Sequence, residues 1–331
     1  ALPILPLDTE RMPPTLSELG YLPSQVEALE EARMRQGGAI ILAGAVGSGK
    51  STTIASLLRS IPSDRKVITL EDPAEFAIPN ALQNSLTRSA HGDDLTIFDR
   101  KLKAIKRSAM NDLLIGEIRD QAAGRAFVDL AATGVSLYTT VHAGSALLIP
   151  DRLCSSFIAI PRDFLMAPGV LKLLVYQVLS RKLCPHCSLD LRQFLSSSAP
   201  RCARSISRTP RWWHEWSATI EKRFGISSLT LRFRHVAGCR QCENDIPHMS
   251  GTMGRTAVAE MFSSTHDAEL FSLLGQADRT NIENWVATRI RKPHVDPDMR
   301  GKSALDCALY KMSIGQIDPR EVETNFGPFL Q

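Results

Sequence analysis

The sequence predicts an α/β fold with a parallel sheet, on the strength of two patterns. Short apolar runs that are typical of strands alternate with segments of helical periodicity, as in chains that build a parallel sheet covered by helices. The run at 39–43 is wholly apolar, which is typical of a strand buried on both faces. Residues 66–70 are expected to form a second buried strand, followed by strands at 113–115 and 135–141.

Helical segments are expected between and after these strands. Their expected bounds are 15–36, 50–60, 96–109, 120–132 and 162–182. The chain is expected to be helical again from Arg255 onward, whereas residues 188–235 are rich in Ser, Arg and Trp and have only weak periodicity.

Length and composition exclude several classes of protein. With 331 residues, the chain is long enough for about two domains. Its 44% hydrophobic and 22% charged residues exclude a disordered, collagen-like or disulfide-stapled chain. No apolar run reaches the ~20 residues of a membrane-spanning helix, and the first ten residues do not have the pattern of a signal peptide. The odd number of cysteines, seven, favours reduced thiols in the cytosol.

A phosphate-binding loop is predicted at residues 44–51, which match the pattern GxxxxGK[ST] in full. The motif follows a buried strand and opens a helix, the context in which it binds nucleotide phosphates. Lys50 is expected to reach the β- and γ-phosphates, and Ser51 to ligate Mg²⁺. The residues expected to contact nucleotide are Gly44, Gly47, Ser48, Gly49, Lys50, Ser51 and Thr52.

Acidic and imidazole side chains follow the next three strands. The segment 71–75 (EDPAE) ends the second strand, 116–120 (GEIRD) ends the third, and 139–142 (TTVH) ends the fourth. Carboxyl ends of parallel strands share one edge of the sheet, where ligands bind. We therefore expect these groups to face the phosphate loop.

The motifs ITLEDPAEF, LLIGEIRD and TTVHAGSA resemble the Asp box, Walker B motif and His box of secretion-superfamily ATPases. These are hexameric motors of type II secretion, type IV pilus assembly and retraction, and type IV secretion or conjugation systems. The resemblance continues in VLSRKLCPHC and GTMGRTAVAEM and covers about residues 15–262. It implies a RecA-like P-loop NTPase core that uses ATP and Mg²⁺. Departures at Asn111 and Val135 indicate a divergent branch, for which a plasmid conjugative-pilus type is one candidate.

The resemblance also implies roles for five side chains. Glu75 corresponds to the glutamate that polarises the attacking water, Glu117 to the Walker B glutamate near Mg²⁺, and His142 to the His-box residue that senses the γ-phosphate. Arg107 and Arg152 resemble arginines that complete the site from a neighbouring subunit or domain. Phosphoryl transfer needs such a positioned water, a metal ion and cationic charge.

Two CxxC pairs, Cys184–Cys187 and Cys239–Cys242, predict a structural zinc site with four thiolate ligands. A single CxxC could instead be redox-active or merely buried, but two pairs favour zinc. In the family that the chain resembles, assembly and secretion motors carry this tetracysteine element and retraction motors usually lack it. The element therefore favours export or assembly.

The expected domains are an ATPase core over 1–180, a tetracysteine subdomain with a basic insert over 181–255, and a helical C-terminal subdomain over 256–331. The domain that precedes the core in full-length members of the family is expected to be absent. The resemblance implies a homo-hexamer in the cytoplasm, at the inner face of the bacterial inner membrane, that acts on an inner-membrane platform protein.

The insert leaves alternatives open. Net charge is only +4, but residues 188–238 carry nine Lys or Arg against three Asp or Glu, beside three Trp. A peripheral lobe with its own aromatic packing is favoured, ahead of peripheral contact with the membrane or its platform protein, and then of nucleic acid. The alternative function is a RecA-like nucleic-acid translocase of a conjugation system. A module that binds ATP without turnover is a third, against which Lys50, Glu75 and Glu117 argue.

Overall fold

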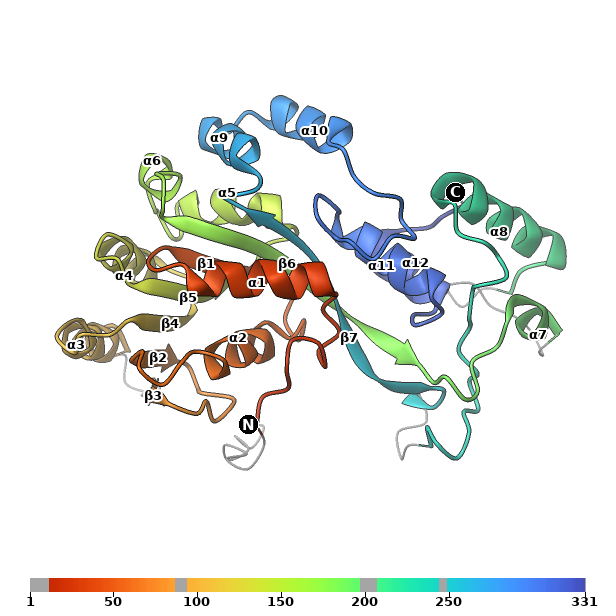
Figure 1. Ribbon diagram of the computed structural model, residues 1–331, viewed down its shortest axis with the longest axis horizontal. Helices are drawn as coiled ribbons and strands as arrows, with labels where there is room; N and C mark the ends of the chain where they lie inside the picture. The colour runs from red at the N-terminus through yellow and green to blue at the C-terminus, as the bar shows by residue number, and fades with distance from the viewer. Residues whose placement is uncertain (1–11, 87–93, 197–206, 244–248, 331) are drawn as a thin grey trace. The chain divides into compact units, whose positions relative to one another are not determined.

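A computed structural model describes residues 12–86, 94–196, 207–243 and 249–330 (Figure 1). Contacts within the chain define two compact units. Unit 1 comprises Ala1–Leu19, Gln25–Gln177 and Glu260–Arg289, and unit 2 comprises Gly20–Ser24, Val178–Ala259 and Ile290–Gln331. The three-domain division at 180 and 255 stays a prediction. The two compact units divide the chain at other residues.

A seven-stranded sheet in the order β3-β2-β4-β5-β1-β6-β7 organises the fold. Its strands are β1 (Ala39–Ala43), β2 (Val67–Glu71), β3 (Ala81–Ser85), β4 (Asp112–Glu117), β5 (Ser136–Val141), β6 (Leu171–Leu183) and β7 (Thr252–Ser263). Each neighbouring pair from β3 through to β6 is parallel. β6 belongs to unit 1 as far as Gln177, and β7 from Glu260.

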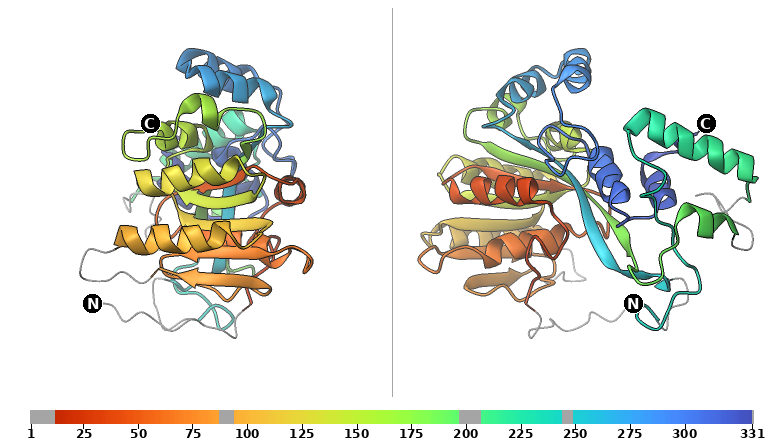
Figure 2. Two further views of the ribbon diagram at one scale, coloured as in Figure 1. Left: turned by 90° about the vertical axis from the view of Figure 1, so that its left-hand side faces the viewer. Right: turned by 45° about the vertical axis from the view of Figure 1, so that its right-hand side comes forward.

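Helices cover the sheet of unit 1 on both faces (Figure 2). They are α1 (Pro23–Met34), α2 (Lys50–Arg59), α3 (Asp94–Lys106), α4 (Gln121–Ala131), η1 (Ala146–Leu148), α5 (Ile149–Cys154), α6 (Arg162–Leu165), α9 (Ala268–Gln276) and α10 (Arg279–Thr288). On β1, Ile41 and Ala43 join the core cluster that includes Phe127 and Leu130 of α4. Ile40 is equally buried but points to the opposite face, as the two-residue period of a strand requires.

The expected strands and helices of residues 39–141 are confirmed as β1, β2, β4, β5, α2, α3 and α4. The helix expected over 162–182 is wrong: α6 is a single turn, and 171–183 form strand β6. The apolar run of β6 at 173–176 lies between the buried polar residues Lys172 and Gln177 and is only four residues long. So short an apolar run cannot be assigned to strand or helix by its period. The helical pattern expected from Arg255 is likewise wrong for residues 255–263, which belong to β7; helix begins only with α9 at Ala268. Strand β3 was not expected.

Unit 2 has an aromatic core of its own. It contains α7 (Leu191–Ser196), α8 (Pro210–Phe224), α11 (Ala304–Ser313) and α12 (Pro319–Phe326). Trp213 and Trp216 of α8 are fully buried, and Phe194 stacks on Phe233 with ring centroids 4.3 Å apart. The Trp216 indole N–H donates to Glu323 Oε1 at 2.8 Å. Residues 188–238 thus pack their aromatic side chains among themselves and against α12, as the favoured interpretation of the insert predicts.

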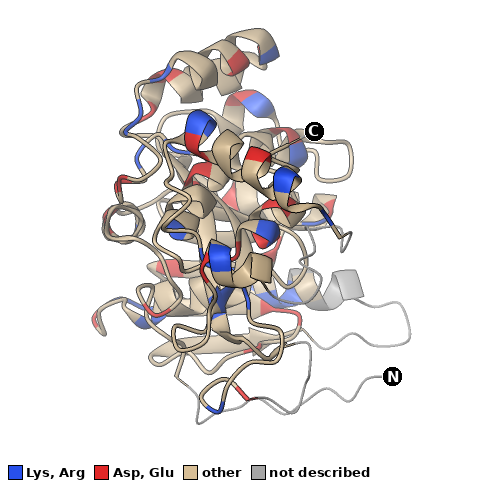
Figure 3. Cartoon of the chain, turned by 90° about the vertical axis from the view of Figure 1, so that its right-hand side faces the viewer, with Lys and Arg blue, Asp and Glu red and all other residues tan. Residues whose placement is uncertain are grey.

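The charged side chains of unit 2 are of mixed sign. Figure 3 shows basic and acidic residues interspersed along the helices that face the viewer. At the start of α8, for example, Arg211 pairs with Glu215 at 2.9 Å. Among the described helices, none is both long and apolar enough to cross a membrane.

Lys311 of α11 is 1% exposed in unit 2. Its ammonium group donates to the carbonyl oxygens of Gly20 and Ala257 and to Thr256 Oγ1. It thereby joins α11, β7 and the chain segment before α1. Burial lowers the pKa of Lys311 from its ordinary 10.5 to about 8.

This pKa predicts that unit 2 becomes more stable as the pH rises from about 8 to 10.5. Over that range the unfolded chain keeps the lysine proton that the folded chain has lost, so the free energy of unfolding rises, by at most about 1.4 kcal/mol per pH unit. Denaturant titrations followed by Trp fluorescence measure it, since three of the four Trp lie in unit 2. Lys311→Met should reduce the pH slope, and Lys222→Met, at an exposed lysine of α8, should not. Equal slopes in all three proteins would contradict the assignment.

Candidate functional site

The loop between β1 and α2 has the backbone geometry that phosphate binding requires. Gly49, the N-cap of α2, is left-handed, with φ 85° and ψ 16°. A Cβ on Gly44 would lie 2.3 Å from the carbonyl oxygen of Gln177, so only glycine fits there. At Gly47 a Cβ would have room, but the backbone there has a positive φ of 76°, which favours glycine. The first-turn N–H groups of α2 have no carbonyl partner within the helix, which makes the loop a site for an anion.

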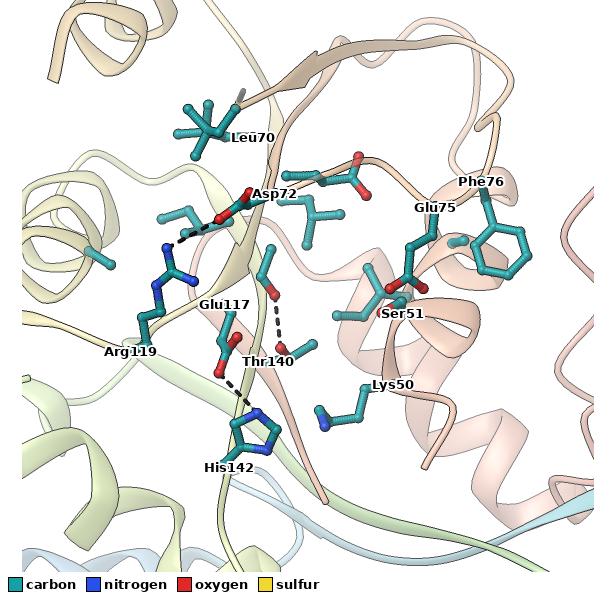
Figure 4. Close-up of a pocket in the computed structure, with 18 of the residues that line it drawn as sticks. Lys50, Ser51, Leu70, Asp72, Glu75, Phe76, Glu117, Arg119, Thr140 and His142 are labelled. Atoms are coloured by element: carbon teal, nitrogen blue, oxygen red, sulfur yellow. Dashed lines mark hydrogen bonds and ion pairs between the residues drawn. The ribbon is translucent and has the colours of Figure 1, made fainter. Parts of the chain in front are cut away.

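A cavity of about 370 Å³ opens over this loop in unit 1. Its lining includes Lys50 and Ser51 of α2, Glu75 after β2, Glu117 at the end of β4 and His142 after β5 (Figure 4). The structure thus brings together the residues that the sequence places at separate strand ends. Of the remaining loop residues predicted to contact nucleotide, Gly47 also lines the cavity.

Lys50 lies at the base of the cavity and is 8% exposed. Its ammonium group donates to the carbonyl oxygens of Gly44 at 2.9 Å and Ala45 at 3.0 Å. Burial lowers the pKa of Lys50, and the carboxylates of Glu117 and Glu75 oppose that shift. A partly desolvated cation beside two carboxylates suits a site that takes up phosphate groups together with a divalent metal ion.

His142 connects the end of β4 to the phosphate loop. Its Nε2 lies 3.1 Å from Glu117 Oε1, and its Nδ1 lies 3.2 Å from the carbonyl oxygen of Gly44. Thr140 Oγ1 donates to the Gly116 carbonyl at 2.8 Å and holds the ends of β4 and β5 together. One imidazole ring therefore contacts both the phosphate loop and Glu117.

The acidic groups after β2 differ in what they contact. Glu71 accepts hydrogen bonds from Thr69 and Gln83, and burial raises the pKa of its carboxyl group. Asp72 pairs with Arg119 at 3.2 Å. Glu75 is exposed and lines the cavity beside Ser51. Its position agrees with the role expected for it, which stays a prediction.

The arginines predicted to complete the site do not line the cavity. Arg107 follows α3 and is exposed, and Arg152 lies half-buried in α5. Their roles stay predictions. Arg119 does line the cavity, and sequence reasoning missed it although it lies within the motif LLIGEIRD, two residues after Glu117.

In unit 2 the four predicted cysteines meet. Their sulfur atoms all lie within 4.8 Å of one another. Three of the separations are 3.8 Å for Cys184–Cys239, 3.6 Å for Cys187–Cys242 and 3.7 Å for Cys239–Cys242. A tetrahedral zinc ion with Zn–S bonds of ~2.3 Å separates its sulfur ligands by ~3.8 Å. The four thiols therefore fit zinc.

Backbone donors stabilise a thiolate at this cluster. The N–H groups of Cys239 and Gly251 donate to Cys242 Sγ at 3.2 and 3.3 Å. Burial alone would raise the pKa of the Cys242 thiol, but these donors and the neighbouring thiols lower it to about 7. A cluster that already holds one sulfur close to its ionised form suits a cation.

Comparison with known proteins identifies the family of the chain. Residues 3–299 match the model of the family described as "Type II/IV secretion system protein". The chain belongs to this family. It is 34% identical over 298 residues to the type II secretion system protein E of Pectobacterium carotovorum subsp. carotovorum, a match that covers 89% of this chain and 52% of that protein. It is 31% identical over 180 residues to the type IV pilus assembly ATPase PilB of Thermus thermophilus, over 54% of this chain and 19% of that protein.

The family's fold is also recognised in a solved structure. The ATPase DotB of Legionella pneumophila superposes with a TM-score of 0.56 at 20% identity, over 95% of this chain and 65% of that chain. The predicted fold class, a RecA-like P-loop core with a parallel sheet and a tetracysteine cluster, is confirmed. The chain spans about half the length of the type II secretion relatives that it matches.

The cysteine geometry predicts about one zinc ion per chain, measurable by metal analysis of protein purified without chelator. Cys187→Ser should abolish retention of the metal, while Cys154→Ser should not, because Cys154 lies in unit 1. Because bound metal contributes folding energy, chelation should speed amide hydrogen exchange over residues 183–196 and 232–243 and leave residues 44–51 unchanged. Equal metal content in both variants would contradict the four-thiolate site.

Proposed function

We propose that the chain is the ATP-hydrolysing region of a hexameric motor that powers pilus assembly or protein secretion across the bacterial envelope. The observation that carries the proposal is the meeting of Lys50, Glu117 and His142 at one cavity, in a chain of the type II/IV secretion family. In this proposal the chain acts at the cytoplasmic face of the inner membrane, on a platform protein of the pilus or secretion system.

Each side chain of the cavity has a task in phosphoryl transfer. Lys50 and the first-turn amides of α2 hold the β- and γ-phosphates. Ser51 and Glu117 would hold Mg²⁺, which when bound would supply positive charge to the phosphate oxygens. Glu75 orients the attacking water, and His142 lies where it can contact the γ-phosphate. The bond of His142 to the Gly44 carbonyl places it beside the loop that holds that phosphate.

The tetracysteine cluster supports assembly or secretion rather than retraction. In the family it accompanies motors that extend pili or export protein, and the four sulfur atoms here have the spacing that zinc requires. The cluster belongs to unit 2, which also carries the Trp-rich helix α8. Peripheral contact of this unit with the membrane or the platform protein is part of the proposal.

A nucleic-acid translocase of a conjugation system is the second candidate, and the basic insert is the observation that favours it. The full burial of Trp213 and Trp216 supports the motor instead, because these rings are not free to stack on bases, and we expect no specific nucleic-acid partner. A salt titration of DNA binding separates the two, because a translocase that contacts several phosphates loses affinity steeply as salt rises. Tight, salt-sensitive binding with DNA-stimulated hydrolysis would favour the translocase.

Glu75→Gln is expected to leave Mg·ATP binding largely intact and to lower kcat at least ~10²-fold, because the amide cannot orient water as a carboxylate does. Lys50→Ala should instead weaken nucleotide binding itself. Glu71→Gln is the matched control, since the amide oxygen can still accept from Thr69 and Gln83. Steady-state hydrolysis and binding of a fluorescent nucleotide measure these effects. An equal loss of kcat in the Glu71 and Glu75 variants would contradict the role of Glu75.

Mixed assemblies test whether an arginine acts between subunits. An arginine supplied by a neighbour contributes a ~10³-fold rate effect or more. Chains with Arg107→Ala, mixed with Glu75→Gln chains, should regain activity, because some interfaces then join an intact glutamate to an intact arginine. Arg152→Ala is tested in the same way. Activity proportional to protein concentration, with no recovery on mixing, would place the arginines within one chain.

A further inference from the structure

Two buried polar side chains, Gln177 and Glu260, contact the loops of the nucleotide site from strands β6 and β7. Gln177 is 1% exposed and Glu260 is 8% exposed. They lie where the two strands pass between the units: Gln177 is the last residue of unit 1 on β6, and Glu260 is its first on β7. Neither residue lines the cavity itself.

Gln177 makes hydrogen bonds to the phosphate loop and to the first turn of α2. Its amide nitrogen donates to the Ser48 carbonyl at 2.7 Å, and its amide oxygen accepts from Thr53 Oγ1 at 2.9 Å. Ser48 precedes Lys50 in the loop, and Thr53 follows it in the first turn of α2. The backbone of Gln177 also approaches Gly44 so closely that a Cβ there would clash. One residue therefore contacts the loop at its start, its end and the first turn of the helix.

Glu260 holds the segment that carries His142. Its Oε1 accepts from the backbone N–H of Ala146 at 2.8 Å, at the start of η1. Only three residues separate His142 from Ala146, so this bond fixes the end of the short loop on which the imidazole is carried. A carboxylate that accepts from a buried N–H makes a stronger bond than a neutral acceptor does.

We propose that Gln177 and Glu260 are positioning residues, each for a different half of the site. Gln177 sets the shape of the phosphate loop, and Glu260 sets the place of His142 beside Glu117. The proposal rests on the function proposed above, because it assigns the two residues to binding and to turnover of ATP. The proposal predicts that loss of Gln177 changes mainly the nucleotide affinity and loss of Glu260 changes mainly kcat. A general loss of stability would change both together.

The test uses Gln177→Met and Glu260→Leu, which remove the hydrogen bonds but keep most of the volume. Gln177→Met should weaken nucleotide binding about tenfold and leave kcat at saturating ATP within a few-fold, since a lost interaction of ~1.4 kcal/mol is tenfold in affinity. Glu260→Leu should lower kcat between ~10- and ~10²-fold with little change in nucleotide affinity, because a small displacement of an aligned group is costly.

Two further variants separate positioning from stability. Glu260→Gln keeps an oxygen that can accept from Ala146, and it should restore most of kcat. Lys172→Met is the matched control on β6: Lys172 is 4% exposed and donates to the Arg35 carbonyl and Ser136 Oγ, which do not line the cavity. It should lower the melting temperature without separating the binding constant from kcat.

Amide hydrogen exchange gives a readout that does not depend on activity. Gln177→Met should speed exchange in residues 44–53, and Glu260→Leu in residues 142–148, while Lys172→Met should change neither segment. Unchanged exchange in both segments, or a fall of binding and kcat in parallel in all variants, would overturn the proposal. A wild-type chain that binds nucleotide without turnover would instead overturn the proposed function, and the exchange results would still decide the positioning of the loops.

Discussion

The parallel register of the sheet is the constraint on which the nucleotide site depends. Ala43 pairs with Val141 on one side and with Tyr176 on the other. The next residues of the three strands are Gly44, His142 and Gln177, which therefore come level at one edge. Gly44 then contacts both of the others: His142 lies at hydrogen-bond distance from its carbonyl oxygen, and Gln177 packs against its Cα. The hydrogen bonds between strands thus bring level the residues that later pair at the site, such as His142 with Glu117.

The sequence was sufficient to predict the elements whose signals are local. β1, β2, β4 and β5 are short, apolar and followed by chemically distinctive turns, and the phosphate loop has a fixed spacing. β6 was missed because its apolar run at 173–176 is too short for a period to separate helix from strand. β3 was missed because ALQNS is half-exposed and mainly polar. The cysteine cluster could be predicted from two CxxC pairs, although 51 residues lie between them.

Contacts over long separations account for the rest of what the sequence did not reveal. Gln177 contacts Ser48 across 129 positions, and Glu260 contacts Ala146 across 114. Nothing in the residues around Gln177 distinguishes it from other polar residues of the segment, since its partners are a backbone carbonyl and a hydroxyl of another element. Arg119 had a local signal, but it takes the structure to show that it pairs with Asp72 at the cavity.

The two strands that hold the nucleotide loops also lead to the cysteine cluster. β6 runs from the Gln177 contact to Leu183, directly before Cys184, and β7 begins at Thr252, directly after Gly251, whose N–H donates to Cys242. Six residues of β6 lie between Gln177 and Cys184, and eight residues of β7 lie between Gly251 and Glu260. Each strand therefore joins a residue that contacts the nucleotide loops to a residue at the cysteine cluster through a short length of hydrogen-bonded backbone.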